Sequence, residues 1–137
     1  MKPPGKVYLI DSNVILRYLL DDHKRFSPKA QKIMEDVSEA VVHAEIRDIV
    51  IVECIYVLEK FYKVPRIDIA DKLSAILNFK GIANPDKHQI MKGLMCYKET
   101  RVDIVDCLLA AHTSPQRLVL SFDNDFKKLK AFQSPGS

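Results

Sequence analysis

The sequence predicts an α/β protein, a three-layer α/β/α sandwich around a central, mostly parallel sheet. Two short, continuous apolar runs, residues 6–10 and 117–122, have the pattern of strands that are covered on both faces. The stretches between them repeat apolar residues at helical spacing, and strands separated by helices are typical of a parallel sheet packed between helices. For a chain of 137 residues we expect a single domain over residues 1–137, with its core at about 6–130 and loose termini.

Local signals mark the ends of each element. The first strand is followed by the N-cap cluster "DSN" (11–13), which opens a helix expected over 14–22. A short strand is expected around 45–47, and a short helix ends the segment 123–132. Five further helices are expected over residues 27–40, 49–63, 66–78, 85–99 and 100–113.

Two of these helices have a predicted N-cap. Ser27 is the expected cap of the helix at 27–40, and Asp48 is the expected cap of the helix at 49–63. The apolar stripe of the second helix is expected at Val52, Ile55, Leu58 and Tyr62.

The composition excludes several classes of protein. Apolar residues make up 47% of the chain and charged residues 28%, which is ordinary for a globular domain. No apolar run approaches the roughly 18 residues that indicate a membrane span, and we see no secretion signal. The three cysteines, Cys54, Cys96 and Cys107, lack a C-x-x-C pair, so we expect reduced, buried thiols in a cytoplasmic protein. The net charge of +3 permits a polyanionic partner without requiring one.

Carboxylates at element ends are the clearest chemical signal. Asp11 directly follows the first strand, and Asp123 directly follows the second. Each has a structural explanation, because Asp11 can cap a helix and Asp123 fits a turn. Glu53 suits the helix macrodipole, and Asp103 completes a T-x-x-D capping box with the preceding threonine, Thr100. Asp106, one turn after Asp103, is harder to explain by such a local role.

Taken together, these acids predict a metal site. Sites in open parallel sheets form at the carboxyl ends of strands, where Asp11 and Asp123 are both expected. Several carboxylates in one cleft repel each other at neutral pH, and divalent cations relieve that repulsion. Oxygen ligands without cysteine or histidine suit Mg²⁺ or Mn²⁺.

Four segments resemble the motifs of PIN-domain nucleases, in particular the small VapC-type toxins of toxin–antitoxin pairs. They are "LIDSNVILRYL", "IVECIYVLEK", "VDIVDCLLAA" and "VLSFDNDF", and the resemblance covers about residues 6–129. The resemblance implies catalytic acids at Asp11, Glu53, Asp106 and Asp123. It adds Asp103 and Asp125 as accessory metal ligands, and it matches Ser121 to the Ser or Thr that stands two residues before the last acid.

The resemblance also implies a function. The expected activity is hydrolysis of RNA phosphodiester bonds by an endoribonuclease with bound Mg²⁺ or Mn²⁺. The expected partners are an RNA substrate, a VapB-like antitoxin and a second copy of the chain in a homodimer. The side chains expected to contact the substrate are Asn13, Arg17, Ser121 and Lys127.

Three alternatives remain open. A phosphotransferase of the haloacid dehalogenase type needs a second acid two residues after Asp11, where this chain has Asn13. A PIN-like module that binds RNA or protein without cleavage has no need of four acids. If every acid is a structural cap, the carboxylates lie far apart.

Overall fold

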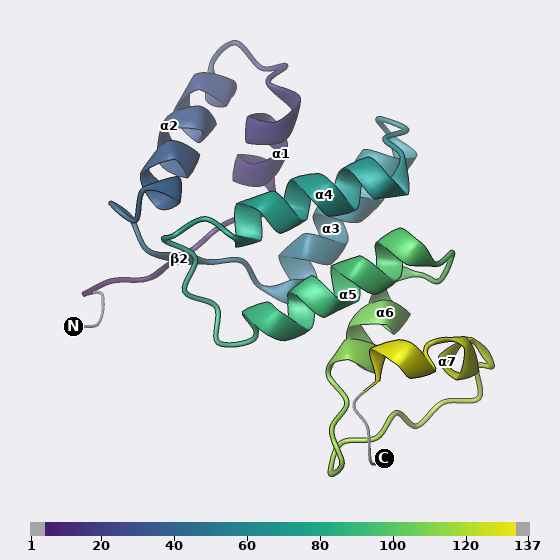
Figure 1. The fold of residues 1–137 in the computed structure, drawn as a ribbon. Helices are drawn as coiled ribbons and strands as arrows, with labels where there is room; N and C mark the ends of the chain where they lie inside the picture. The colour runs from purple at the N-terminus through teal and green to yellow at the C-terminus, as the bar shows by residue number, and fades with distance from the viewer. Residues whose placement is uncertain (1–4, 134–137) are drawn as a thin grey trace.

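The structure, a computed structural model, describes residues 5–133 (Figure 1). The expected looseness of the termini falls partly on residues 1–4 and 134–137, which lie outside the described residues. The elements are β1 (Tyr8–Leu9), α1 (Ser12–Leu20), α2 (Phe26–Ser38), β2 (Ala44–Glu45), α3 (Asp48–Lys60), α4 (Arg66–Leu77), α5 (Lys87–Glu99), α6 (Ile104–Ala111), α7 (Asp125–Lys128) and the 3₁₀ helix η1 (Lys130–Phe132).

The fold has the predicted α/β class and is consistent with a three-layer sandwich, since helices surround a small parallel sheet. β1 and β2 are parallel, with Tyr8 opposite Ala44 and Leu9 opposite Glu45. On the other side of β2, Ala44 forms a parallel bridge with Ile82. β2 therefore lies in the middle of the sheet and β1 at its edge.

The strand predictions need two corrections. β1 is an edge strand and not a covered central one, and its Tyr8 and Leu9 are 56% and 68% exposed. Residues 117–122 form no strand in the described structure, and Leu120 and Phe122 are fully exposed. Local hydrogen bonds at both ends of this segment explain the difference. Ser114 and Arg117 exchange backbone hydrogen bonds in a tight turn, and the amide of Asp123 donates to Ser121 Oγ.

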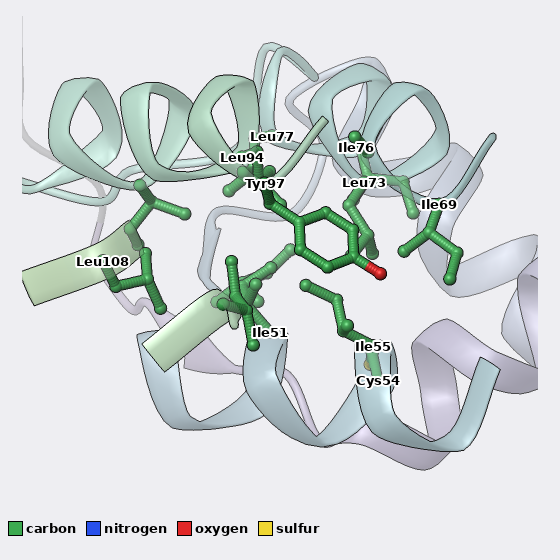
Figure 2. Packing of buried hydrophobic residues seen from close by; sticks show 14 of the residues in the cluster. Ile51, Cys54, Ile55, Ile69, Leu73, Ile76, Leu77, Leu94, Tyr97 and Leu108 are labelled. Atoms are coloured by element: carbon green, nitrogen blue, oxygen red, sulfur yellow. The ribbon is translucent and has the colours of Figure 1, made fainter. Parts of the chain in front are cut away.

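The core lies between the helices. α3 contacts α1, α4 and α6, while α5 packs against α4 and α6. Figure 2 shows buried side chains of α3, α4, α5 and α6 converging around the ring of Tyr97. The labelled residues include Ile51, Cys54 and Ile55 from α3, Ile69, Leu73, Ile76 and Leu77 from α4, Leu94 from α5 and Leu108 from α6. All three cysteines are buried free thiols, as predicted.

Four helix-end predictions are wrong in detail. The N-cap of α3 is Arg47, and Asp48 is the first residue of the helix and not its cap. α2 begins at Phe26, and its first amides donate to the His23 ring, so Ser27 is not its N-cap. Thr100 Oγ1 donates to the carbonyl of Cys96 at the end of α5, and Asp103 itself caps α6. α3 ends at Lys60, which leaves Tyr62 outside the helix and 40% exposed. At α2 the His23 ring takes the place of the expected cap, and Thr100 bonds to the end of α5 and does not open α6. α3 stops before its apolar pattern does.

Candidate functional site

Three carboxylates meet where α6 and α7 approach each other. Asp106 lies in the first turn of α6. Asp123 lies in the loop that precedes α7, and Asp125 is the first residue of α7. One carboxylate oxygen from each lies within 4.8 Å of those of the other two. Asp106 and Asp125 are half-buried, and Asp123 is exposed. The group offers oxygen ligands only, which matches the preference of Mg²⁺ and Mn²⁺.

Electrostatics in this group oppose full ionisation. Burial raises the pKa of Asp106, and the negative charges of Asp123, Asp103 and Asp125 raise it further. A bound cation acts in the opposite direction, because it favours the charged form of each carboxylate. Cation binding is therefore expected to lower the raised pKa of Asp106.

Local hydrogen bonds begin the two helices that carry these acids. The amide of Val105 donates to Asp103 Oδ2 over 3.0 Å and starts α6, which places Asp106 one turn further on. The amide of Asp125 donates to Asp123 Oδ1 over 2.9 Å, and this Asx turn begins α7. These bonds allow the acids to act both as caps and as candidate ligands, because a carboxylate can accept more than one interaction.

Tyr56 connects this group to α3. Its hydroxyl donates to Asp103, with oxygen–oxygen distances of 3.2 and 3.3 Å to the two carboxylate oxygens. Burial raises the pKa of Tyr56, and the charge of Asp103 adds to the effect, so the hydroxyl stays protonated as a donor. Sequence reasoning missed Tyr56, although its position one turn after Glu53 on the same helix is a signal that could have found it.

A second acidic group lies at the carboxyl end of β1. Ser12, which is 1% exposed, donates from Oγ to Glu53 Oε1 over 2.8 Å and joins α1 to α3. Asp11 is the N-cap of α1, and its Oδ2 accepts from the amide of Asn13 over 3.4 Å. Burial raises the pKa of Cys54 to about 12, and the nearby charges of Glu53 and Asp11 contribute, so both acids share one environment.

The structure thus divides the predicted acids into two groups. Asp106, Asp123 and Asp125 form one, with Asp103 beside them. Asp11 and Glu53 form the other, and among the described residues they are not within the 4.8 Å cluster. Sequence reasoning treated Ser12 only as a helix-cap residue, and its seryl hydroxyl is the group that holds Glu53.

The side chains predicted to contact substrate lie in different places. Asn13 and Arg17 line a groove of about 500 Å³ between α1 and α2, together with Phe26 and Lys29. Arg17 is paired with Asp22 over 2.9 Å. Ser121 Oγ accepts from the amide of Asp123, and Lys127 lies on α7 two residues after Asp125. Its neighbour Lys128 pairs with Asp125 over 3.4 Å. Within residues 5–133, no helix combines the length and apolar character needed to cross a membrane.

These features agree with comparisons to known proteins. Residues 8–131 match the PIN domain, so the chain belongs to the PIN domain family, as its motifs predicted. The chain is also 28% identical over 123 residues to a VapC ribonuclease of Aquifex aeolicus (strain VF5). That alignment covers 88% of this chain and 90% of the relative. No solved structure matches the chain.

Proposed function

We propose that this protein is a metal-dependent endoribonuclease and the toxin of a toxin–antitoxin pair. Its PIN domain and its similarity to a VapC ribonuclease over most of both chains support the activity and the RNA substrate. The single structural observation that carries the proposal is the group of three carboxylates within 4.8 Å. Burial and the charges of Asp123, Asp103 and Asp125 raise the pKa of Asp106 in this group, and a bound divalent ion would relieve that repulsion.

The residues fit Mg²⁺ or Mn²⁺. Asp106, Asp123 and Asp125 supply oxygen ligands, and Asp103 contributes charge at the edge of the group. When held there, such an ion would supply a water ligand of lowered pKa and stabilisation of charge on the leaving oxygen. The acids of this chain would hold the ion and orient the attacking water, while the hydrogen bond from Tyr56 fixes the position of Asp103.

We further propose that Asp11 and Glu53 complete the site when residues 117–122 pair with the free edge of β1. Leu118, Leu120 and Phe122 expose at least 64% of their surface, and β1 has a partner on one side only. An unpaired, apolar strand edge favours the addition of another strand. Parallel pairing places the end of that segment beside the end of β1, so Asp123 approaches Asp11.

RNA and protein partners follow from the same proposal. Lys127 and Ser121, next to the acids of α7 in the chain, and Arg17 and Asn13, which line the groove between α1 and α2, hold the phosphate backbone on either side of the cleaved bond. A VapB-like antitoxin occupies this acidic region, a homodimer forms, and the protein acts in the cytoplasm.

A second candidate function is a PIN-like module that binds RNA or protein without cleaving. The observation that favours it is the separation of Asp11 and Glu53 from the three-carboxylate cluster. This alternative predicts that the protein binds RNA with the same affinity in the presence or absence of a divalent cation. Substitution of an acid should not change that affinity either.

The test uses purified protein, free of any antitoxin, incubated with total cellular RNA in Mg²⁺, Mn²⁺ or EDTA. Asp11→Asn and Asp106→Asn are compared with Asp71→Asn. Asp71 is an exposed acid on α4 that pairs with Lys98 of α5 and belongs to neither acidic group. The proposal predicts cleavage in Mg²⁺ or Mn²⁺, none in EDTA, and loss in the first two variants only. Cleavage that survives EDTA and all three substitutions would refute it, and binding without cleavage would favour the alternative.

A further inference from the structure

The thiols of Cys96 and Cys107 meet inside the core. Cys96 lies on α5 and Cys107 on α6, and both side chains are fully buried. Their Sγ atoms are 2.8 Å apart. This separation is shorter than an ordinary non-bonded contact between sulfur atoms, and it exceeds the disulfide bond length of about 2.05 Å by less than 1 Å. The third cysteine differs, because Cys54 Sγ lies 3.9 Å from the carbonyl oxygen of Ser12.

Close packing of the two helices produces this contact. A Cβ placed on Gly93 of α5 would lie 2.6 Å from Leu108 Cδ2, so α6 approaches α5 more closely than a larger residue would allow. Gly93 precedes Cys96 by one turn, and Leu108 follows Cys107 directly. The sulfur atoms therefore meet next to a tight contact between the two helices.

The connection between α5 and α6 is also held in place. Arg66 donates to the carbonyl oxygens of Tyr97 and Val102, over 2.9 and 2.6 Å from Nη2. Thr100 Oγ1 donates to the carbonyl of Cys96 and accepts from the amide of Val102. The segment from Cys96 to Cys107 is thus fixed by hydrogen bonds while its two ends are in contact, and bond formation needs only a small movement of the side chains.

We propose that Cys96 and Cys107 are a redox modification site, at which a peroxide forms a reversible disulfide between α5 and α6. One thiolate attacks hydrogen peroxide, breaks its O–O bond, and becomes a sulfenic acid as hydroxide leaves. The second thiol attacks the sulfenic sulfur, forms the S–S bond and releases water. In total, two thiols lose two electrons and two protons, and one peroxide becomes two waters. Dithiothreitol reverses the oxidation by thiol–disulfide exchange.

Such a bond would act on the helix that carries Asp106, the residue directly before Cys107. It joins the last turn of α5 to the first turn of α6 and closes a loop of residues 96–107. The proposal does not depend on nuclease activity, since it rests on the two sulfur atoms alone. The competing explanation is that both cysteines are small apolar core residues that stay reduced.

The experiment treats the full chain with hydrogen peroxide, then counts thiols in denaturant and maps disulfides by mass spectrometry without reduction. We expect three thiols before treatment and one after it, a mass loss of two hydrogens, and a peptide pair joined through Cys96 and Cys107. The oxidised protein should unfold about 10 °C higher than the reduced protein, since the closed loop restricts the unfolded chain. Dithiothreitol should restore both the thiols and the original melting temperature.

Matched variants separate this pair from general oxidation. Cys54→Ala should form the disulfide normally, whereas Cys96→Ser and Cys107→Ser should keep their remaining thiols and show no melting shift. Three thiols persisting after treatment of the natural chain would overturn the proposal. Loss of thiols to sulfinic acids, or to disulfides between chains, without the Cys96–Cys107 peptide would overturn it as well.

Discussion

The contact between Gly93 and Leu108 predicts that Gly93→Ala destabilises the natural chain and stabilises a chain without the Leu108 side chain. In the natural chain, an alanine Cβ at position 93 would lie 2.6 Å from Leu108 Cδ2, 3.3 Å from its Cγ and 3.4 Å from its Cα. Moving the Leu108 side chain away costs about 1–3 kcal/mol of stability, because Leu108 is buried in a packed core. Alanine recovers about 1 kcal/mol through its better helix propensity. Gly93→Ala should therefore lower the free energy of unfolding by about 1 kcal/mol.

The same substitution should stabilise a chain that lacks the Leu108 side chain. Leu108→Ala alone should cost about 2–4 kcal/mol, since it removes a buried side chain. With that side chain absent, only the propensity gain remains, and Gly93→Ala should add up to about 1 kcal/mol. The coupling free energy between the two positions would then be about 1–3 kcal/mol.

The assay is urea unfolding of the four proteins, reduced and in EDTA. Gly5→Ala is the control, because an added Cβ there has no atom within 4 Å. Equal effects of Gly93→Ala in both backgrounds would show that the close approach of α5 and α6 is not what position 93 requires.

Three further predictions concern the rest of the structure. Ser12→Ala should lower the free energy of unfolding, measured in urea, by about 1.5 kcal/mol. This is the low end for a hydrogen bond to a charged group, because Glu53 remains exposed to water. Gly81→Ala should cost more than about 3 kcal/mol, or prevent folding, because its Cβ would meet the backbone carbonyl oxygens of residues 37 and 42; circular dichroism melting checks this. Asp106→Asn should raise the melting temperature at pH 7 in EDTA and leave it unchanged near pH 3. The folded-state pKa of Asp106 is raised above its ordinary value of 3.8, so the ionised side chain destabilises the folded protein at pH values above 3.8 and has no effect below it. A lower melting temperature of Asp106→Asn at pH 7 would contradict the assigned repulsion.

The helices and the α/β fold class were predictable because the periodic pattern of apolar residues repeats along the chain. The period of the apolar residues locates α3, α4 and α5, and each helix lies within or close to its expected range. Buried cysteines were predictable from composition alone. These features depend on many residues, so an error at one position changes little.

The strands were less predictable, because a strand depends on a partner that the local sequence does not specify. Residues 117–122 have strong β propensity, yet the turns at Ser114 and Asp123 direct them away from the sheet. Helix caps failed for a similar reason. The His23 ring, and not Ser27, receives the first amides of α2, and no periodic pattern reveals such a contact.

The candidate site was predictable by residue type more than by geometry. Acids after apolar runs and on helix starts indicated Asp106 and Asp123, the family resemblance added Asp125, and these three acids do meet. Tyr56 and Ser12 were missed as site residues because hydroxyl side chains have many structural roles. Only the short distances from these two hydroxyls to the carboxylates of Asp103 and Glu53 show that they belong to the site. Asp11 and Glu53 were predicted to share this site, and among the described residues they lie outside the 4.8 Å group.

The central claim is that the three-carboxylate cluster binds a divalent ion that RNA cleavage requires. The most direct measurement titrates Mn²⁺ into the protein by calorimetry and follows RNA cleavage at the same Mn²⁺ concentrations. We predict that cleavage rises with occupancy, and that Asp106→Asn loses both binding and cleavage while Asp71→Asn retains both. Undiminished Mn²⁺ binding in Asp106→Asn, or cleavage at zero occupancy, would contradict the claim.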